Sequence, residues 1–209
     1  MRAAALILAL AAATAACAQH PHSFSDAEKW ARVFDDPQRD EWQKPHEVIE
    51  ALKLAPDAVV ADIGAGTGYF AVRFAHRLPR AKIYATDIEP EMVQYLVMRA
   101  KREGLANLSA VKGEMDDAKL PEPVDLALLV DVYHHIDDRG AYFGRLARSF
   151  RPGGRLAIID FTLDSDIGPP PRARIAPEQV KRELADAGYA LAEELELLPN
   201  QYFLVFRPK

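Results

Sequence analysis

The apolar positions of this chain follow two periods, one typical of buried strands and one typical of helices. Over most of the chain, short apolar runs alternate with longer segments whose apolar residues recur every three or four positions. The last two runs are separated only by residues 198–201, which predicts an antiparallel hairpin at the edge of a sheet. The predicted strands are residues 59–63, 82–86, 108–111, 124–130, 155–159, 189–197 and 202–206. This alternation predicts an α/β fold with a doubly wound, mostly parallel, seven-stranded sheet.

Residues 19–55 precede the first strand and are predicted to form a helical N-terminal cap, whereas residues 56–209 form the main domain. Within the cap, a serine–aspartate N-cap is followed by apolar residues at helical spacing, and a second helix is expected over residues 46–54. Phe34 and Trp42 are candidates for lining a ligand pocket, although packing of the helices onto the sheet explains these aromatic residues equally well.

Residues 1–18 have the layout of a secretory signal peptide, with a positive start, an apolar stretch and small residues after it. The apolar stretch is too short for a transmembrane helix, which needs roughly 20 apolar residues. Ala16-Cys17-Ala18 suits a signal peptidase, but residues 14–17 resemble a bacterial lipobox, which we favour. We therefore expect an exported protein, either periplasmic or lipid-anchored at the cell envelope through Cys17, and a cytoplasmic one only if the leader does not function. Cys17 is the single cysteine, so the mature chain has no disulfide and no thiolate site.

The most informative segment is VVADIGAGTGYF, residues 59–70, in which a predicted strand enters a glycine-rich turn and then a helix. Glycines let the backbone approach a ligand closely, and the free N–H groups of a helix start attract an anion or a polar group. The turn therefore predicts a nucleotide-like ligand. A dinucleotide fingerprint would need a glycine in place of Tyr69, and the sequence has no Tyr-x3-Lys pair, so an NAD-linked oxidoreductase is disfavoured.

Ligands of open α/β sheets bind beyond the carboxyl ends of the strands, where this chain places four aspartates. They are Asp62, Asp87, Asp131 and Asp160. Asp87 follows the second strand, 19 residues after Gly68, where a carboxylate can accept hydrogen bonds from a ribose diol. These positions make the strand ends the first place to look for a binding site.

The order of these motifs resembles that of the class I S-adenosylmethionine-dependent methyltransferases, over roughly residues 45–207. The resemblance rests on the acid before a turn with glycines at alternate positions, on Asp87, and on the turn at residues 151–154. Residues 131–136 resemble the segment after the fourth strand in small-molecule members, including relatives of the ubiquinone/menaquinone C-methyltransferases. The resemblance implies a Rossmann-like fold, S-adenosylmethionine as cofactor, and methyl transfer to a small-molecule acceptor.

The resemblance also implies which residues contact the cofactor. Asp87 would hold the ribose hydroxyls with Ile88 on the adenine face, while Met115 would pack on the ring and Asp116 would meet the adenine amino group. Asp117 could take the role of Asp116. The predicted cofactor-binding residues are Asp62, Gly64, Ala65, Gly66, Gly68, Tyr69, Asp87, Ile88, Met115, Asp116 and Asp131.

Methyl transfer is an in-line displacement at a sulfonium carbon, so the enzyme must orient the acceptor and remove its proton if it carries one. A histidine suits proton removal near neutral pH, which makes His134 and His135 candidate general bases. Adjacent residues at a helix start point in different directions, so we expect at most one to face the site, and both could instead only bond the backbone. Tyr133 is a further candidate, through contact with the methionine end of the cofactor or of its ring face with the sulfonium.

Composition narrows the choice of partners. The chain has 209 residues, of which 49% are apolar, enough for one domain with a substantial core. Its net charge of −5, without a basic patch, argues against nucleic acid, and its histidines and single cysteine do not have metal-ligand spacing. We expect a small-molecule acceptor, no metal, and membrane contact only through Cys17. A catalytically silent S-adenosylmethionine-binding protein is the alternative, because the leader predicts export to a compartment where the cofactor is not made.

Overall fold

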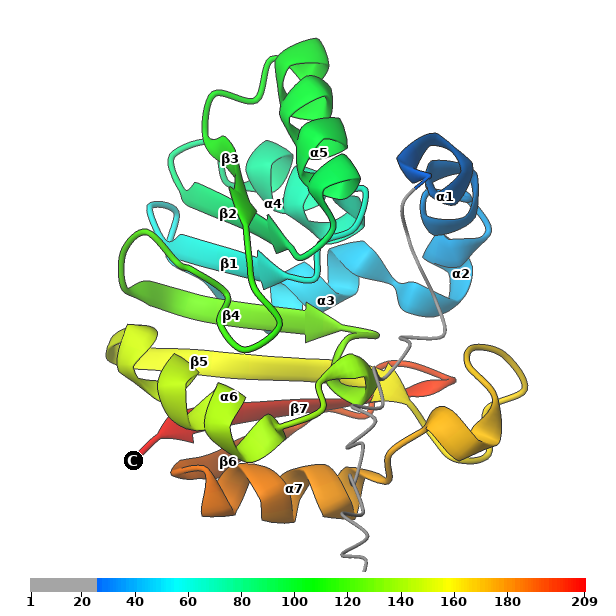
Figure 1. Cartoon of the computed structure of the whole chain (residues 1–209), viewed down its shortest axis with the longest axis vertical. Helices are drawn as coiled ribbons and strands as arrows, with labels where there is room; N and C mark the ends of the chain where they lie inside the picture. The colour runs from blue at the N-terminus through cyan, green and yellow to red at the C-terminus, as the bar shows by residue number, and fades with distance from the viewer. Residues whose placement is uncertain (1–25) are drawn as a thin grey trace, which may run out of the picture.

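A seven-stranded sheet forms the centre of the computed structural model, which describes residues 26–209 (Figure 1). The predicted leader, residues 1–18, lies outside the described residues. The strands are β1 (Val59–Ile63), β2 (Lys82–Asp87), β3 (Leu108–Lys112), β4 (Val124–Val130), β5 (Phe150–Phe161), β6 (Tyr189–Glu194) and β7 (Gln201–Pro208). Their order is β3-β2-β1-β4-β5-β7-β6, with β1 to β5 parallel and β7 antiparallel to both of its neighbours. The predicted α/β fold with an antiparallel C-terminal hairpin is confirmed.

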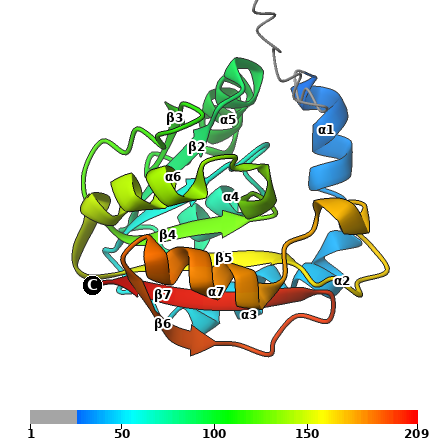
Figure 2. The ribbon, with the colours of Figure 1, turned by 60° about the horizontal axis from the view of Figure 1, so that its bottom comes forward.

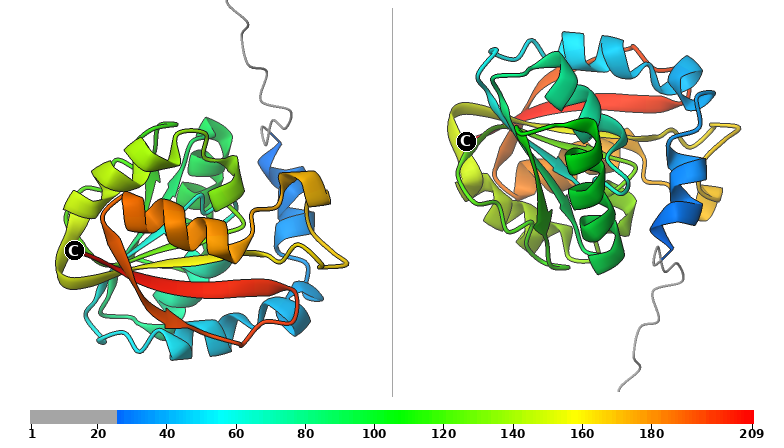
Figure 3. Two further views of the ribbon diagram at one scale, coloured as in Figure 1. Left: turned by 90° about the horizontal axis from the view of Figure 1, so that it is seen from below. Right: turned by 90° about the horizontal axis from the view of Figure 1, so that it is seen from above.

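Helices cover both faces of the sheet and create two apolar layers (Figures 1 and 3). Apolar residues of α3, α4 and α5 pack on one face, and those of α6 and α7 pack on the other. None of the helices between residues 26 and 209 has both the length and the apolar character that a membrane span requires. The helices are α1 (Ala27–Phe34), α2 (Arg39–Gln43), α3 (Pro45–Ala51), α4 (Tyr69–Arg77), α5 (Pro90–Glu103), α6 (Arg139–Leu146) and α7 (Pro177–Asp186), with short 3-10 turns at Tyr133–His135, Ala147–Ser149 and Pro171–Ala173.

The first two helices, α1 and α2, lie beyond the carboxyl ends of the parallel strands, toward which the strand arrows point (Figures 1 and 2). Asp26 caps α1 by accepting a hydrogen bond from the N–H of Lys29 at 3.0 Å. Lys44 separates α2 from α3 with a left-handed φ of 43°, and Pro45 starts α3 where no N–H is needed. The chain therefore turns sharply from the edge of the sheet onto its face, which leaves α1 and α2 over the strand ends.

The structure differs from the sequence prediction at residues 151–154, which were expected to form a turn before the fifth strand. Instead, β5 already begins at Phe150, which pairs with Val124, and the register with β4 shifts after this pair. A Cβ on Gly154 would lie 2.8 Å from the carbonyl oxygen of Val124, so only glycine allows this approach. The segment is the irregular start of a long strand, because its glycines accommodate the shift in register.

Candidate active site

The glycine turn, residues 64–68, joins β1 to α4 at the carboxyl edge of the sheet. The N–H groups of Gly64 and Ala65 both donate to the carbonyl oxygen of Thr86, at 2.8 and 2.9 Å. Gly64 has a φ of 70°, and a Cβ there would lie 2.5 Å from Cγ2 of Val132. The turn is therefore fixed to β2 on one side and packs closely against the segment after β4 on the other.

Main-chain donors fix both carboxylate oxygens of Asp87, the last residue of β2. Oδ2 accepts from the N–H of Gly66 at 2.8 Å, and Oδ1 accepts from the N–H of Glu89 at 2.9 Å. Burial raises the pKa of Asp87, against the opposing effect of its backbone hydrogen bonds. Each oxygen of a carboxylate has two lone pairs, so Asp87 is held in place and can still accept a hydrogen bond from a ligand.

Ile88 and Met115 follow the ends of β2 and β3 and expose apolar side chains, which have relative accessibilities of 44% and 46%. The two strand ends are joined, because the N–H of Gly113 donates to the carbonyl oxygen of Asp87 at 2.9 Å. Apolar side chains exposed close to a fixed carboxylate are the features that binding of a planar base on a ribose requires. Their positions agree with the roles predicted for these two residues, which stay predictions.

Asp116 forms an ion pair with Arg145 of α6, with 2.6 Å between Oδ2 and Nη1. The hydrogen bond from Arg145 lowers the pKa of Asp116. Its side chain is 65% exposed, and such surface pairs contribute little stability. Its neighbour Asp117 accepts from the N–H of Lys119 at 2.8 Å. Arg145 contacts only one carboxylate oxygen of Asp116, and the predicted contact of Asp116 with an adenine amino group stays a prediction.

Asp62, the acid before the turn, is buried at the end of β1. Its Oδ2 accepts from the N–H of Ala71 at 2.9 Å, and Gly68 occupies the N-cap position of α4 with a φ of 93°. Burial raises the pKa of Asp62 to about 7. The structure thus shows Asp62 holding the first turn of α4 against β1, and its predicted contact with the cofactor stays a prediction.

The cap covers the glycine turn. A Cβ on Gly66 would lie 3.3 Å from the ring of Phe34, the last residue of α1. Arg99 of α5 fixes the end of this helix by donating to Asp35 Oδ2 and to the carbonyl oxygen of Thr67, each at 2.9 Å. One guanidinium therefore joins the cap, the turn and α5.

Tyr69, the first residue of α4, is buried between the cap and the main domain. The guanidinium groups of Arg39 and Arg73 lie 4.0 and 3.9 Å from the centroid of its ring. Its hydroxyl donates to Asp40 Oδ1 at 2.5 Å, and Arg73 donates to the same oxygen at 2.8 Å. The structure therefore uses Tyr69 to anchor α2, and the predicted contact with the cofactor stays a prediction.

Asp131 directly follows β4, has a left-handed φ of 59° and joins a network of buried and partly buried polar side chains. Its Oδ1 accepts from Gln201 Nε2 at 2.5 Å, and its Oδ2 lies 3.4 Å from Arg39 Nη2. Gln201 in turn accepts from Gln43 Nε2 at 2.5 Å. Burial raises the pKa of Asp131 to about 7, although the charge of Arg39 opposes the shift. The network connects α2, β4 and β7 at the strand ends.

His134 and Asp160 form a buried pair beside this network. His134 Nδ1 lies 2.8 and 3.0 Å from the two carboxylate oxygens of Asp160, at the carboxyl end of β5. Burial alone would lower the pKa of His134, but the hydrogen bond and the charge of Asp160 raise it overall. A histidine whose Nδ1–H is held by a carboxylate presents Nε2 as a proton acceptor. The pair therefore has the arrangement of a general base with its orienting acid.

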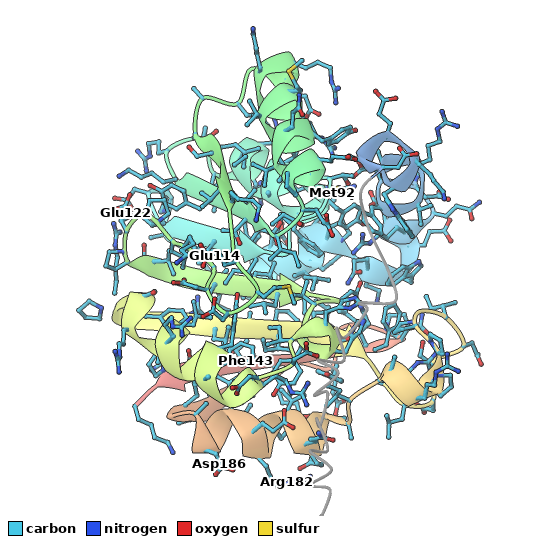
Figure 4. The ribbon with its side chains drawn as sticks, in the orientation of Figure 1. Met92, Glu114, Glu122, Phe143, Arg182 and Asp186 are labelled. Carbon is cyan, nitrogen blue, oxygen red and sulfur yellow. The ribbon has the colours of Figure 1, made fainter. Side chains whose placement is uncertain are left out.

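The other two catalytic candidates have different surroundings. The ring of His135 lies 4.1 Å from that of His134, and its side chain is exposed. The ring of Tyr133 is fully buried and stacks at 5.2 Å on Phe143, which Figure 4 labels on α6. The Tyr133 hydroxyl donates to Glu183 of α7 at 2.7 Å. The structure therefore brings only His134 of these three candidates to the acids at the strand ends.

The structure adds residues and contacts to this site that sequence reasoning did not predict. Asp160 carried a signal and was named among the acids that follow predicted strands, yet nothing paired it with His134. Gln201 and Arg39 carried none, since neither belongs to a motif and their contacts reach Asp131 from opposite ends of the chain. Tyr202 is the partner of Asp160 in the β5–β7 ladder. Its hydroxyl is buried and has no hydrogen-bond partner among the described residues.

Comparisons with known proteins show which proteins this chain resembles. Residues 60–154 match the family described as "Methyltransferase domain". An uncharacterized methyltransferase of Mycobacterium tuberculosis is 34% identical over 125 residues, which are 59% of this chain and 48% of the relative. An O-methyltransferase of Pyrenophora dematioidea is 28% identical over 166 residues, which are 72% of this chain and 61% of the relative. The chain thus spans about half to three-fifths of the length of these two relatives.

A solved structure extends the match to the whole fold. The S-adenosylmethionine-dependent methyltransferase of Aquifex aeolicus superimposes with a TM-score of 0.79 at 28% identity, covering 88% of this chain and 98% of that one. A second such enzyme, from Clostridium acetobutylicum, has a TM-score of 0.67 at 14% identity, covers 87% of this chain and 98% of that one, and supports the fold alone. The family match lies over the segment that carries the glycine turn, Asp87 and Asp131.

Proposed function

We propose that this protein transfers a methyl group from S-adenosylmethionine to a small-molecule acceptor, with support from the match of residues 60–154 to the methyltransferase-domain family. The observation that carries the proposal is the hydrogen bond between Gly66 N–H and Asp87, at 2.8 Å. It joins the glycine turn to the carboxylate at the neighbouring strand end. His134 and Asp160 lie at the carboxyl ends of the next two strands, so one edge of the sheet carries groups for both binding and proton transfer.

The side chains at this edge fit the parts of S-adenosylmethionine. Asp87 can accept hydrogen bonds from the ribose diol. The exposed side chains of Ile88 and Met115 can pack against the adenine ring. The methionyl end carries both an ammonium and a carboxylate, and Asp131 and Arg39 offer the complementary charges next to the turn. Bound there, the cofactor supplies an electrophilic methyl group on a sulfonium.

The proton chemistry falls to His134. We propose that its Nε2 takes the proton of the acceptor as the acceptor atom bonds the methyl carbon and the departing sulfur keeps the C–S electron pair. Asp160 holds Nδ1–H and stabilises the imidazolium that forms. The relative named as an O-methyltransferase favours a hydroxyl as the group that loses this proton.

For location, we propose export and lipid attachment at the cell envelope. The support is the leader pattern and the lipobox-like sequence at residues 14–17, both outside the described residues. Fractionation of cells that express the wild type and Cys17→Ala tests this: we expect the wild type in membranes and the variant in the soluble periplasm. Recovery of both proteins in the cytoplasm would contradict export.

Calorimetric titration with S-adenosylhomocysteine tests the cofactor assignment. We expect the wild type to bind and Asp87→Ala to lose about 100-fold in affinity, because a buried hydrogen-bonded carboxylate is worth roughly 1.5–3 kcal/mol. Asp186→Ala is the matched control, since this aspartate is exposed on α7 (Figure 4). Equal affinity in Asp87→Ala and the wild type would contradict the site. If cofactor binding is normal but a broad screen with labelled methyl groups finds no acceptor, the protein binds the cofactor without turning it over.

A further inference from the structure

Arg174 organises the loop that follows β5, residues 162–174. A guanidinium has five N–H donors in a fixed plane and no acceptor, so it can collect several carbonyl oxygens at once. Arg174 donates to five of them, those of Thr162 (3.4 Å), Leu163 (3.2 Å), Ser165 (2.6 Å), Ile167 (3.1 Å) and Pro169 (2.8 Å). A single side chain therefore fixes the path of a loop that lacks helix or strand over most of its length.

A second contact fixes the loop to the end of β5. Gly168 has a φ of 94°, and a Cβ there would lie 2.7 Å from three ring atoms of Phe161. Phe161 is 5% exposed, and its ring centroid lies 5.8 Å from that of Trp42 on α2. Figures 2 and 3 show the loop beside the cap. The loop, the strand end and the cap therefore meet at one aromatic pair.

This aromatic pair adjoins the groups assigned to proton transfer. Phe161 directly follows Asp160, which holds His134 at 2.8 Å. On the other side, Trp42 lies 5.8 Å from the guanidinium of Arg39, which reaches Asp131. The loop is thus linked to Asp131 through Phe161, Trp42 and Arg39, and to Asp160 only through the chain of β5.

The loop also exposes apolar side chains. Leu163 and Ile167 have relative accessibilities of 52% and 37%, although their backbone carbonyls are held by Arg174. Exposed apolar groups on a fixed backbone are prepared for a ligand, because little conformational freedom is lost when the ligand binds. A loop that served only as a connection would need neither the five carbonyl contacts nor these side chains.

We propose that Arg174 is a positioning residue that holds the apolar side chains of residues 161–167 as a preformed wall of the acceptor site, and that this wall selects an uncharged, apolar acceptor. The two exposed aspartates of the same segment, Asp164 and Asp166, add repulsion against an anionic acceptor. The proposal rests on the proposed function, since the wall adjoins His134 and Asp160. Here "wall" means Phe161, Leu163 and Ile167 together with Trp42. Arg174 acts through the backbone of the loop and touches no reacting atom.

The test compares Arg174→Lys with Arg172→Lys, an exposed arginine of the same loop. A lysine ammonium has three donors at one point and cannot serve five separated carbonyls. With S-adenosylhomocysteine at saturation, equilibrium dialysis measures the binding of 1-naphthol as the apolar probe and of 4-hydroxybenzoate as the charged one. We expect the wild type to prefer 1-naphthol, and Arg174→Lys to bind it about tenfold more weakly. We also expect Arg174→Lys to exchange amide hydrogens of residues 162–174 about tenfold faster, with unchanged affinity for S-adenosylhomocysteine. Arg172→Lys should match the wild type in all three measurements.

Several results would overturn the proposal. They are no preference for 1-naphthol in the wild type, unchanged exchange in Arg174→Lys, or faster exchange with unchanged 1-naphthol binding. If Arg174→Lys does not fold, the double variant Leu163→Ser, Ile167→Ser decides, because both side chains are exposed, and unchanged 1-naphthol binding there also rejects the wall. A wild type that binds no S-adenosylhomocysteine would instead reject the proposed function, so the two failures are distinguishable.

Discussion

In the half of the site formed by β1, β2 and β3, main-chain groups fix the two buried aspartates at the strand ends, whereas in the half formed by β4, β5 and β7 side chains fix one another. We call these the cofactor half and the acceptor half. Asp62 and Asp87 accept only backbone N–H donors among their described hydrogen bonds. Asp131, by contrast, is bound by Gln201 and Arg39, and Asp160 binds the ring of His134 as well as backbone groups.

The difference separates two kinds of requirement. A cofactor that is the same in every turnover needs donors and acceptors at constant positions, and backbone geometry provides them with little loss of freedom. An acceptor that gives up a proton needs groups that titrate near neutral pH, and buried side-chain pairs provide those. In the acceptor half, burial raises the pKa of Asp131 to about 7, and Asp160 raises the pKa of His134. The cofactor half also contains a buried acid of raised pKa, Asp62, but no side chain is paired with it among the described hydrogen bonds.

The strongest test of this division is the removal of His134. We expect His134→Ala to lower turnover by roughly 10²–10⁴-fold, the contribution of a positioned base, while affinity for S-adenosylhomocysteine stays within about twofold. Labelled-methyl assays on an acceptor found in a cell-envelope extract measure the rate. His135→Ala is the matched control and should keep most of the activity, since this neighbour is exposed. Full turnover in His134→Ala would mean that the acceptor half does not remove the proton.

A smaller effect is expected at Gly64, where the two halves touch. Gly64→Ala combines a left-handed φ of 70° with a Cβ placed 2.5 Å from Val132 Cγ2, so we expect a loss of about 2 kcal/mol in the free energy of unfolding. Gly104→Ala is a matched control, because its φ of 67° is similar but no atom lies within 4 Å. It should lose about 1 kcal/mol, from backbone strain alone. Urea unfolding measures both, and Gly64→Ala with Val132→Ala should recover the difference. Equal losses of unfolding free energy in the two single variants would show that the close contact between Gly64 and Val132 adds no cost to a side chain at position 64.

The smallest effect concerns the buried acid of the cofactor half. Asp62 keeps its proton up to about pH 7 in the folded protein, against an ordinary value of 3.8, so its ionisation opposes folding. Its favourable contribution is complete below about pH 4 and is lost as the pH rises toward 7. Relative to the wild type, Asp62→Asn should therefore gain roughly 1 kcal/mol in the free energy of unfolding between pH 4 and pH 5. Urea unfolding at both pH values measures this, with Asp186→Asn on the surface as the control. A constant difference between Asp62→Asn and the wild type would show that Asp62 is already ionised at low pH.

The same division explains which parts of the fold and the site the sequence predicts. All seven strands, the hairpin and the glycine turn follow from local apolar periods and turn residues. The irregular start of β5 does not, because it depends on the fit of Gly154 against Val124 in another strand. Local patterns specify an element well, but they do not contain the contacts between elements.

For the site, the sequence predicts contacts between residues that are close along the chain and misses contacts between residues that are far apart. Asp87 lies 21 residues from the amide that holds it, within one turn–helix–strand unit, and the motif predicts where it lies. Gln201 lies 70 residues from Asp131 and 158 from Gln43, so no window of sequence contains this network. Tyr69 and Tyr133 belong to motifs, yet a motif does not state which way a side chain points. Their surroundings, two arginines for Tyr69 and Phe143 for Tyr133, are set by packing.

The place of β7 in the sheet also has a consequence for biosynthesis. This last strand inserts between β5 and β6 and supplies Gln201 and Tyr202, whereas the cofactor half is complete in sequence by about residue 117. At roughly 5–20 residues per second, a ribosome needs several more seconds to deliver Gln201. A nascent chain therefore contains the cofactor half before the acceptor half can close. Chains truncated before β7 are expected to be the species most in need of chaperones, since the β5 edge of their sheet is uncovered.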